Sequence, residues 1–493
     1  MALSNVSRVV NTKELDNKRW LVRALLLSAV LTILFAKVYL TFYVIDMGVG
    51  IYSILTSFVL FNILFISYFR YKDPYWKVFD KKIPENEMPL VSIVVPVKNE
   101  EADISTCIQS CIDQTYKNKE IIVIDDGSTD KTGIILDEIK AHNPSSNLKI
   151  VHLKESVGKK KAIEAASKIA KGEIYAFMDS DCDMAHDATE KAVQLFYSDK
   201  QLGAVTGHGR VKNRHAGGFT DHFLEKLQDV YADGACRAQK GMESVFSSVT
   251  CCAGSLSFYR RDAIQDFIPQ WARDRFLGME FKFATDRRMT AHVLSTRPPK
   301  ISYQSSSQQQ TTLPILTGTG YTSKNLVTDH SDSDDNKSSS YKKQQVNGYW
   351  KVLYSQSIKV NIGVPPTLES LIKQQVRWRK SFIRSLFAAG GIFWKRPFYV
   401  ALLYYLQTSM KFIRPYIVAS TVVFMPLMGD YVTPIVWFAG VLFTGMIYAV
   451  DFRLRNPGDR NWLYRPFFTL LSTYVYTWLL IYAAITIKRT GWR

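Results

Sequence analysis

Long apolar segments at both ends of the chain limit its possible folds more than any other feature of the sequence. Two of them, residues 21–45 and 49–69, are each long enough to cross about 30 Å of hydrocarbon. Further apolar stretches occupy residues 397–428, 432–450 and 466–487. The first segment is too long for the apolar core of a signal peptide. The chain is therefore predicted to be a membrane protein with a large region outside the bilayer.

Basic residues flank the N-terminal pair of apolar segments. They are Lys13, Lys18, Arg19 and Arg23 before the first, and Arg70, Lys72, Lys77, Lys81 and Lys82 after the second. Positive flanks mark cytoplasmic sides, so the central region is predicted to be cytoplasmic. This topology and contact with anionic lipid account for much of the net charge of +18. Because no zinc-finger spacing or RNA-binding signature occurs, no nucleic-acid partner is expected.

The apolar segments and the flanking charges give different numbers of crossings. Lys411, Arg414 and Pro415 interrupt the stretch 397–428, so residues 397–411 are interpreted as interfacial and 412–428 as spanning. This interpretation gives five crossings. Basic residues at the C-terminal end predict an internal C-terminus, which requires an even number. A broken or re-entrant segment would remove the conflict.

All the cysteines lie between the membrane regions, in the part of the chain predicted to be cytoplasmic. They are Cys107, Cys111, Cys182, Cys236, Cys251 and Cys252. Cytoplasmic thiols stay reduced, so free thiols are expected. No CxxC spacing or histidine partner indicates a metal site at these cysteines.

From residue 90 the pattern becomes that of an α/β domain. Apolar runs that predict strands are "LVSIVVPV" (90–97), "EIIVID" (120–125), "LKIVHL" (148–153) and "EIYAFMD" (173–179). Helical stretches separate these runs. Alternating strands and helices predict a mostly parallel sheet with helices on both faces.

Acidic side chains follow two of these strands. Asp125 and Asp126 end the second strand, and Asp179 and Asp181 follow the fourth. Open α/β sheets bind ligands at the carboxyl ends of their strands. An Asp-x-Asp pair suits Mg²⁺ or Mn²⁺, although alone it is more often a solvated loop. The sequence "GKKKA" (158–162) opens a helix, where lysines suit a phosphate, although a solvated basic face is the simpler alternative. Together these features favour a pocket for a nucleotide diphosphate.

Two segments after the α/β region differ from it in character. Residues 298–350 are rich in Ser, Gln, Thr and Asp with little periodicity, which is typical of a disordered insertion. Residues 370–389, "SLIKQQVRWRKSFIRSLFAA", have helical spacing with basic and apolar faces. This second pattern predicts a helix lying at the membrane surface.

Several motifs, in order, resemble those of the processive family 2 glycosyltransferases, and most of all hyaluronan synthases. They are "VSIVVPVKNEE", "IIVIDDGSTD", "GKKKA", "FMDSDCD", "CCAGSLSFYRR", "FLGMEFKFATDRRMT" and "QQVRWRKSFIR", with "TIKRTGWR" at the end. The resemblance implies a Rossmann-like α/β GT-A domain inserted between transmembrane helices, with amphipathic interface helices. It also implies inverting transfer from UDP-sugars, a growing polysaccharide acceptor, a channel made by the same chain, and Mg²⁺ or Mn²⁺.

The same resemblance assigns roles to individual residues. Asp125 or Asp126 would hold the uridine, and Lys159 and Lys160 the diphosphate. Asp179 with Asp181 would bind the sugar nucleotide and the metal. Asp286 would be the catalytic base, with Arg287 turned away from it. Gln374, Arg377 and Trp378 form the QxxRW motif, whose arginine suits phosphate and whose tryptophan suits an acceptor sugar.

The resemblance also organises the chain into segments. They are a transmembrane hairpin at 1–85, a catalytic domain at 86–297, an insertion at 298–350, the QxxRW region with interface helices at 351–411, and a transmembrane region at 412–493. We expect a multi-pass protein of the cell membrane with a cytoplasmic catalytic domain.

The sequence departs from the family pattern at three places, one of which is the 298–350 insertion. Ala284 and Thr285 replace the Gly and the first Asp before Asp286, and the C-terminal motif is shortened to Gly491-Trp492-Arg493. The leading hypothesis is synthesis of hyaluronan or a close analogue from UDP-GlcNAc and UDP-GlcA. The alternatives are a chitin-like or other single-sugar β-glycan synthase, a lipid-linked glycosyltransferase making one transfer, and an inactive binding or export scaffold.

Overall fold

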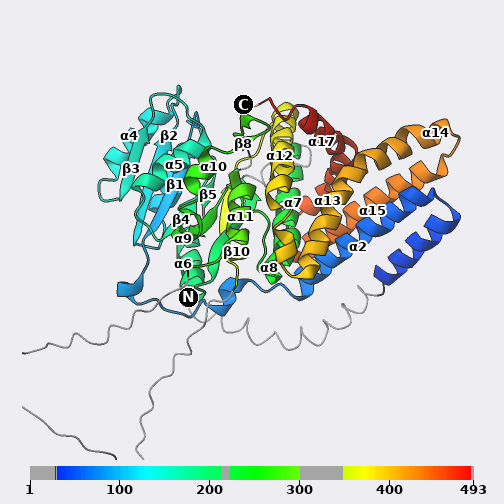
Figure 1. The fold of residues 1–493 in the computed structure, drawn as a ribbon, viewed down its shortest axis with the longest axis horizontal. Coiled ribbons are helices and arrows are strands. Elements are labelled where there is room, and N and C mark those ends of the chain that lie inside the picture. Colours follow the sequence, from blue (N-terminus) through cyan, green and yellow to red (C-terminus); the bar gives the residue numbers. More distant parts are fainter. Residues whose placement is uncertain (1–27, 29, 213–221, 284, 300–347, 490–493) are drawn as a thin grey trace, which may run out of the picture.

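The computed structural model describes residues 28, 30–212, 222–283, 285–299 and 348–489. Ala284, the C-terminal Gly491-Trp492-Arg493, the first basic flank and nearly all of the 298–350 insertion lie outside these ranges. Figure 1 shows an α/β domain on the left and a bundle of long apolar helices on the right. Helices α7 (Phe223–Gly234) and α12 (Leu368–Ala389) lie between them.

An eight-stranded sheet forms the centre of the α/β domain, in the order β3-β2-β1-β4-β7-β6-β10-β5. The strands are β1 (Val91–Val97), β2 (Lys119–Asp125), β3 (Leu148–His152), β4 (Ile174–Phe177), β5 (Asp183–Met184), β6 (Leu202–Val211), β7 (Ser257–Arg260) and β10 (Lys351–Ile362). Strands β3, β2, β1 and β4 are parallel, as are β6 and β10, whereas β7 and β5 run antiparallel to their neighbours. The expected sheet is confirmed.

Helices cover both faces of this sheet because its strands are apolar on both sides. In β1, Val94 packs into one core while its neighbours Ile93 and Val95 pack into the other, as strand alternation requires. One core is closed by α5 (Lys159–Ile169), α9 (Arg261–Ile264), α10 (Ile268–Ala272) and α11 (Thr285–Ser295). The other is closed by α3 (Ile104–Ile112), α4 (Thr132–His142) and α6 (Ala188–Ser198).

Strand β10 joins the sheet from beyond the insertion. It pairs in parallel with β6 from Lys351 to Ile362. The segment 351–411, expected to hold the QxxRW region and the interface helices, begins inside the sheet of the α/β domain. Further short elements include α8 (Gly241–Val245) and the two-stranded sheet of β8 (Arg275–Phe276) and β9 (Met279–Glu280).

Four helical segments of the described chain are long and apolar enough to cross a membrane: Met47–Lys77, Phe398–Leu427, Val432–Arg455 and Asn461–Ile485. They contain α2 (Met47–Phe69), α13 (Phe398–Ala419) with α14 (Met425–Leu427), α15 (Val432–Arg455), and α16 (Arg465–Leu470) with α17 (Tyr476–Ile485). A shorter apolar helix covers Val30–Tyr43.

Helix α13 is continuous across the position where the sequence analysis placed a boundary. Residues 411 and 412 lie within it, and Pro415 is buried inside the same helix. Apolar packing with α2 holds the helix together on both sides of the proline. The predicted boundary between an interfacial part and a spanning part therefore falls inside one continuous helix.

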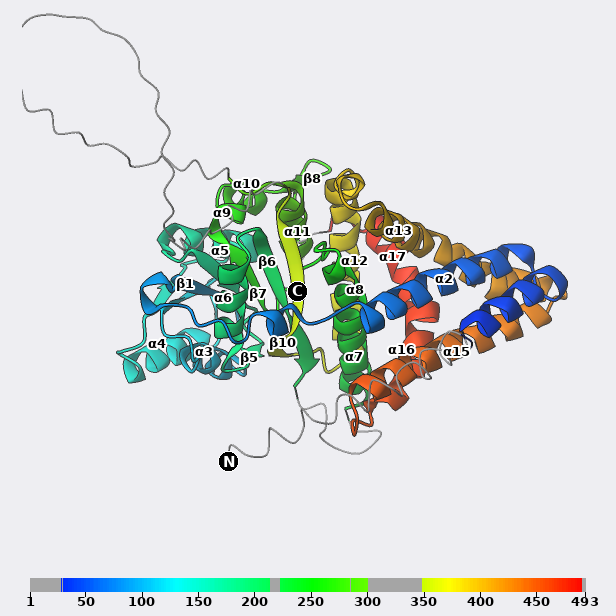
Figure 2. The same cartoon turned by 90° about the horizontal axis from the view of Figure 1, so that it is seen from below.

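The last apolar segment differs from the others in where its ends lie. Asn461 Nδ2 donates to Asp229 Oδ2 on α7 at 3.1 Å, and beyond the other end Lys380 Nζ of α12 donates to the Arg489 carbonyl at 2.7 Å. Both ends therefore contact helices at the α/β domain. Helix α16 packs against both α15 and α7, and α17 packs against α12 (Figure 2).

Candidate active site

The site lies where β1, β2 and β4 end. The pairing of β1 with β4 stops at Val94, which lies opposite Phe177. Pro96 lies beyond this point, where β1 no longer has to donate a backbone N–H to β4, so a proline is tolerated there. Pro96 and Phe177 line a pocket at this edge together with Lys159, Asp179 and Asp286. These residues lie far apart in the sequence and converge at this edge, whereas Asp125, Asp126 and Asp181 are not among the residues that line the pocket.

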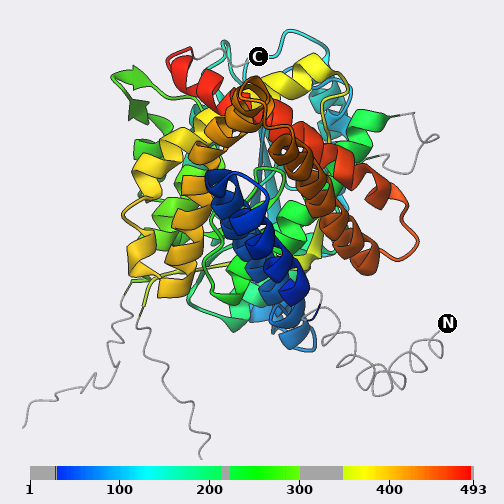
Figure 3. The same ribbon diagram turned by 90° about the vertical axis from the view of Figure 1, so that its right-hand side faces the viewer.

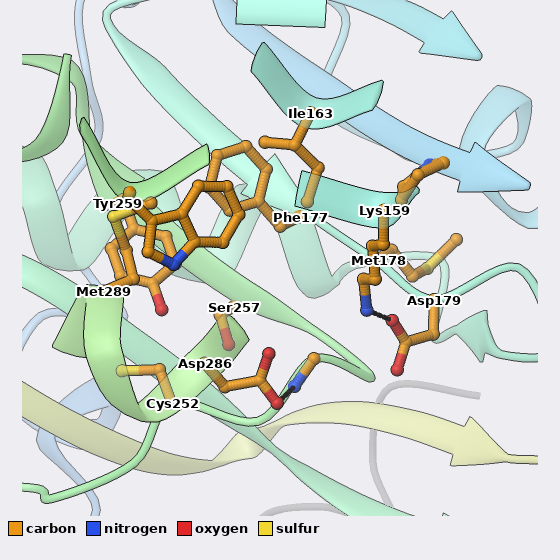
Figure 4. Close-up of a pocket in the computed structure, with 13 residues that line it drawn as sticks. Lys159, Ile163, Phe177, Met178, Asp179, Cys252, Ser257, Tyr259, Asp286 and Met289 are labelled. Atoms are coloured by element: carbon orange, nitrogen blue, oxygen red, sulfur yellow. Dashed lines mark hydrogen bonds and ion pairs between the residues drawn. The ribbon is translucent and has the colours of Figure 1, made fainter. Parts of the chain in front are cut away.

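Lys159 and Asp179 form an ion pair in this pocket (Figure 4). Lys159 is the first residue of α5, and Gly158 before it has a φ of +90°, which a residue with a side chain rarely adopts. Burial alone would lower the pKa of the Lys159 ammonium, but Asp179, Asp286 and Asp181 around it hold this pKa above its ordinary value. The pocket therefore stabilises positive charge.

Asp286 enters the pocket from the first turn of α11. Its Oδ2 accepts a hydrogen bond from Gly254 N at 3.1 Å, and its backbone oxygen accepts one from Thr290 Oγ1 at 2.7 Å. A Cβ atom at Gly254 would lie 3.0 Å from Asp179 Oδ2 and 3.2 Å from Asp286 Oδ1. The two carboxylates thus approach each other across a position where only glycine leaves room.

Asp181 completes the acidic group and could hold a divalent ion with Asp179. Burial and the neighbouring Asp179 raise the pKa of the Asp181 carboxyl. The described residues contain no cluster of three or more His, Cys, Asp or Glu side chains suited to a metal. Mg²⁺ and Mn²⁺ are commonly held by one or two carboxylates, with phosphate and water as the other ligands, so this pair fits such an ion.

Asp125 and Asp126 are both buried and organise the ends of β2 and β3. Asp125 accepts from Ser128 N at 3.0 Å and lies 2.9 Å from His152 Nδ1. The Asp126 carboxylate accepts from Ser156 Oγ and from the backbone N–H groups just before α5. Asp126 therefore fixes the loop that delivers Lys159.

Lys160 points in a different direction from Lys159. Its Nζ donates to the Phe281 carbonyl at 2.7 Å and lies 3.6 Å from Asp274 Oδ2. Arg384 of α12 binds the other oxygen of the same aspartate at 2.6 Å. The structure thus places Lys160 in a buried cluster beside the pocket rather than with Asp179.

Arg287 follows Asp286 in α11, and the expectation that its side chain points away from Asp286 stays a prediction. Its electrostatic neighbours are Cys251, Tyr231 of α7, Glu243 of α8 and Tyr404 of α13. Glu243 also accepts hydrogen bonds from both the N–H and the hydroxyl of Thr250, at the start of the segment that leads to Gly254. The arginine therefore lies between the pocket and the helical bundle.

The QxxRW residues lie on α12, which packs against α11 and α17. Trp378 is 41% exposed, and its ring centre lies 6.3 Å from that of Tyr231. Arg377 is half-buried and has no ion pair within the described part of the chain. Gln374 Oε1 is buried without a hydrogen-bond partner among the described residues.

Three residues that shape the pocket were not predicted from the sequence. Gly254 positions Asp286, while Tyr259 and Trp271 form walls of the pocket. The run of small residues Ala253-Gly254-Ser255 was the available signal for a close approach of backbone to side chains. The two aromatic walls had no such signal, because strand and helix cores also contain aromatic residues.

Comparison with known proteins assigns the domain. Residues 92–268 match the model of glycosyl transferase family 2. The chain contains a family 2 glycosyltransferase domain. The resemblance to this family, and the GT-A type of α/β fold that it implied, are confirmed. All six cysteines are free, also as expected.

Individual relatives extend the similarity beyond that domain. A hyaluronan synthase from Streptococcus pyogenes is 23% identical over 460 residues, which cover 92% of this chain and 93% of the relative. An N-acetylglucosaminyltransferase from Rhizobium meliloti (strain 1021) is 32% identical over 210 residues, covering 42% of this chain and 47% of the relative. A solved mannosyltransferase from Pyrobaculum calidifontis, in complex with GDP-Man and Mn²⁺, aligns with a TM-score of 0.49 at 16% identity, covering 89% of this chain and 98% of that one.

Proposed function

We propose that this chain is a membrane-embedded, processive, inverting glycosyltransferase. It polymerises UDP-GlcNAc and UDP-GlcA into hyaluronan or a close analogue, and it extrudes the polymer through its own helices. The observation that carries this proposal is the convergence of Lys159, Asp179 and Asp286 in one pocket beside the bundle. The similarity to a hyaluronan synthase over 92% of the chain supports the choice of product.

In this proposal the residues of the pocket divide the chemistry between them. Asp286 removes the proton from the acceptor hydroxyl, and its hydrogen bond from Gly254 N fixes its orientation. Lys159 leaves its ion pair with Asp179 to bind the diphosphate of the donor. Arg377 offers a second cation to phosphate, and Trp378 supplies a flat surface for the acceptor sugar.

The remaining assigned residues act around this centre. Asp125 or Asp126 recognises the uridine of the donor. Lys160 supports the binding of the donor diphosphate indirectly, through the buried cluster that it forms with Asp274. Gln374 offers its unpartnered side-chain oxygen to a ligand. Asp181 with Asp179 holds Mg²⁺ or Mn²⁺. When bound, such an ion supplies positive charge that offsets the charge developing on the departing UDP.

We propose that the chain crosses the cell membrane through Val30–Tyr43 with the apolar residues before it, α2, α13 with α14, and α15. Asp46 N at the start of α2 donates to Thr433 Oγ1 near the start of α15, so these turns meet at the end of the bundle away from the α/β domain. The segment Asn461–Ile485 returns to the α/β domain at both ends and lies along the membrane surface. An even number of crossings then agrees with a cytoplasmic catalytic domain and the charge pattern.

The runner-up is a chitin-like or other single-sugar β-glycan synthase. It is favoured by the 32% identity to an N-acetylglucosaminyltransferase over 210 residues. That match covers less than half of either chain, so we rank it second. A lipid-linked glycosyltransferase that makes one transfer remains the third candidate.

The deciding experiment supplies the purified protein with labelled UDP-sugars singly and in pairs, with Mg²⁺ or Mn²⁺. A long product that needs both UDP-GlcNAc and UDP-GlcA, and that a hyaluronan-specific hydrolase degrades, is the expected result. Polymer from UDP-GlcNAc alone would support the chitin-like synthase. A lipid carrying a single sugar would contradict processivity.

A further inference from the structure

The β8–β9 hairpin has an unusual residue at its turn. Leu277 and Gly278 connect the two strands, with φ values of +51° and +82°. Two-residue hairpin turns with positive φ at both positions normally use Asn, Asp or Gly. A leucine there carries backbone strain that a glycine would avoid.

Contacts within the described chain do not offset that strain. The Leu277 side chain is 57% exposed, and Met279 beside it is 40% exposed. Strained backbone that the fold does not compensate is a pointer to a functional contact. A leucine at such a position is therefore explained best by an apolar partner outside the chain.

Neighbouring elements extend the exposed apolar surface toward the bundle. Phe276 in the hairpin packs on Phe387 of α12, with ring centres 5.3 Å apart, and Phe387 is 73% exposed. Trp394, in the short 3-10 helix Phe393–Lys395, and Phe398, the first residue of α13, follow and are 70% and 75% exposed. Figure 3, viewed from the side of the bundle, shows the hairpin as the green strands projecting beyond the helices at upper left.

Charge around this surface is mainly basic. Arg275, Lys282 and Lys395 are exposed. The acidic Glu280 is neutralised by Lys161, whose Nζ lies 2.9 Å from its Oε1. Exposed apolar side chains with basic neighbours match the boundary between acyl chains and anionic headgroups.

We infer that the β8–β9 hairpin is a membrane-surface anchor that inserts Leu277 and Met279 at the interface of an anionic bilayer. The exposed apolar surface of the hairpin continues to α13, which enters the membrane a few residues after Trp394 in the proposed topology. The partner of this surface is therefore lipid rather than a soluble protein. This inference rests on the proposed embedding in a membrane but not on the identity of the sugars.

The anchor has a direct route to the catalytic residue. Phe281 and Phe283 follow the hairpin, and they pack together with Phe276 and with Ile487 near the C-terminal end. Asp286 comes three residues after Phe283. Anchoring the hairpin therefore holds the segment leading to Asp286 at a fixed height above the bilayer.

A fluorescence experiment on the full-length protein tests the anchor. Leu277→Cys is labelled with the environment-sensitive dye NBD and reconstituted in nanodiscs of phosphatidylcholine, with or without phosphatidylglycerol. Ile134→Cys is the matched control, because Ile134 is an apolar side chain of α4 that is 61% exposed. Unsubstituted protein treated with the dye gives the background from Cys251, which is half-buried.

The expected result is loss of NBD emission at position 277, but not at 134, when lipids carry a nitroxide near the headgroup. The loss should be larger with phosphatidylglycerol, and Arg275→Gln with Lys282→Gln should remove that difference. Equal emission and equal quenching at the two positions would overturn the inference. Equal quenching at position 277 in both lipid mixtures would overturn the inferred preference of the hairpin for anionic lipid. If Leu277→Cys does not fold, Met279→Cys takes its place. None of these measurements depends on sugar transfer, so they do not depend on the proposed enzymatic function.

Discussion

Replacing Asp286 by Asn keeps the size of the side chain and an oxygen that can accept from Gly254 N, but removes the proposed base. Loss of a general base typically costs 10²- to 10⁴-fold, so we expect kcat to fall on the order of 10²-fold or more. Donor binding, measured by calorimetric titration with UDP, should persist. Asp80→Asn, at an exposed aspartate, is the control. Unchanged polymer output from Asp286→Asn would remove this residue from the mechanism.

Gly254→Ala tests the geometry of the same pocket from the other side. The added methyl group would crowd Asp179 and Asp286 at 3.0 and 3.2 Å. Displacing catalytic groups by a fraction of an ångström to an ångström can cost on the order of 10²-fold in rate, and we expect a loss of that size. Gly391→Ala is the matched control, because nothing lies within 4 Å of its added Cβ. Full activity in Gly254→Ala, with an unchanged thermal midpoint, would contradict the proposed close approach.

At the scale of elements, the ends of β2, β3 and α4 are joined by His152. Its Nδ1 lies 2.9 Å from Asp125 on β2, and its Nε2 lies 3.3 Å from Asp137 on α4. The hydrogen bond with Asp125, with a smaller contribution from Asp137, raises the pKa of His152 against the opposing effect of burial. The stabilisation is therefore complete below the ordinary histidine pKa of about 6.5 and is lost as pH rises through the raised pKa.

We expect amide exchange in β3, after correction for the intrinsic rate, to increase between pH 6 and pH 8. The effect should stay below about 1 kcal/mol, because the His152 side chain is 40% exposed and its ion pairs are screened by solvent. His152→Gln should remove the pH dependence, whereas His142→Gln, at an exposed position on α4, should not. Equal pH dependence in the wild type and His152→Gln would show that another group titrates.

Elements were predictable from the sequence where the pattern was local. Strands β1 to β4 and the acidic residues at their ends follow from short apolar runs and the turns after them. Strand β10 was missed as a part of the sheet because its partner β6 lies on the other side of a long insertion, so no local pattern connects them. The ion pair between Lys159 and Asp179 was missed for the same reason, because α5 and β4 meet only in the fold. The polar residues in α13 predict a break, whereas packing against α2 keeps that helix continuous.

For the whole molecule, a buried ionic network joins the α/β domain to the bundle. Arg210 of β6 binds Asp229 of α7 through two hydrogen bonds of 2.8 and 2.7 Å. The same guanidinium reaches Asn456 at 3.1 Å and Asp459 at 2.8 Å, in the connection after α15. Asp229 is fully buried, so its charge depends on these partners.

Arg210→Gln would leave Asp229 without its main cation inside the junction. Breaking a buried pair by removing one partner costs about 3–5 kcal/mol, and we expect a clearly lower thermal midpoint in nanodiscs. Lys373→Gln is the matched control, because it removes an ion pair with Glu369 whose side chains are 67% and 79% exposed. Solvent screens such an exposed surface pair, so this variant should unfold like the wild type. Equal midpoints for the two variants would show that the network does not hold the catalytic domain on the bundle, and the two parts would then be joined mainly by apolar packing.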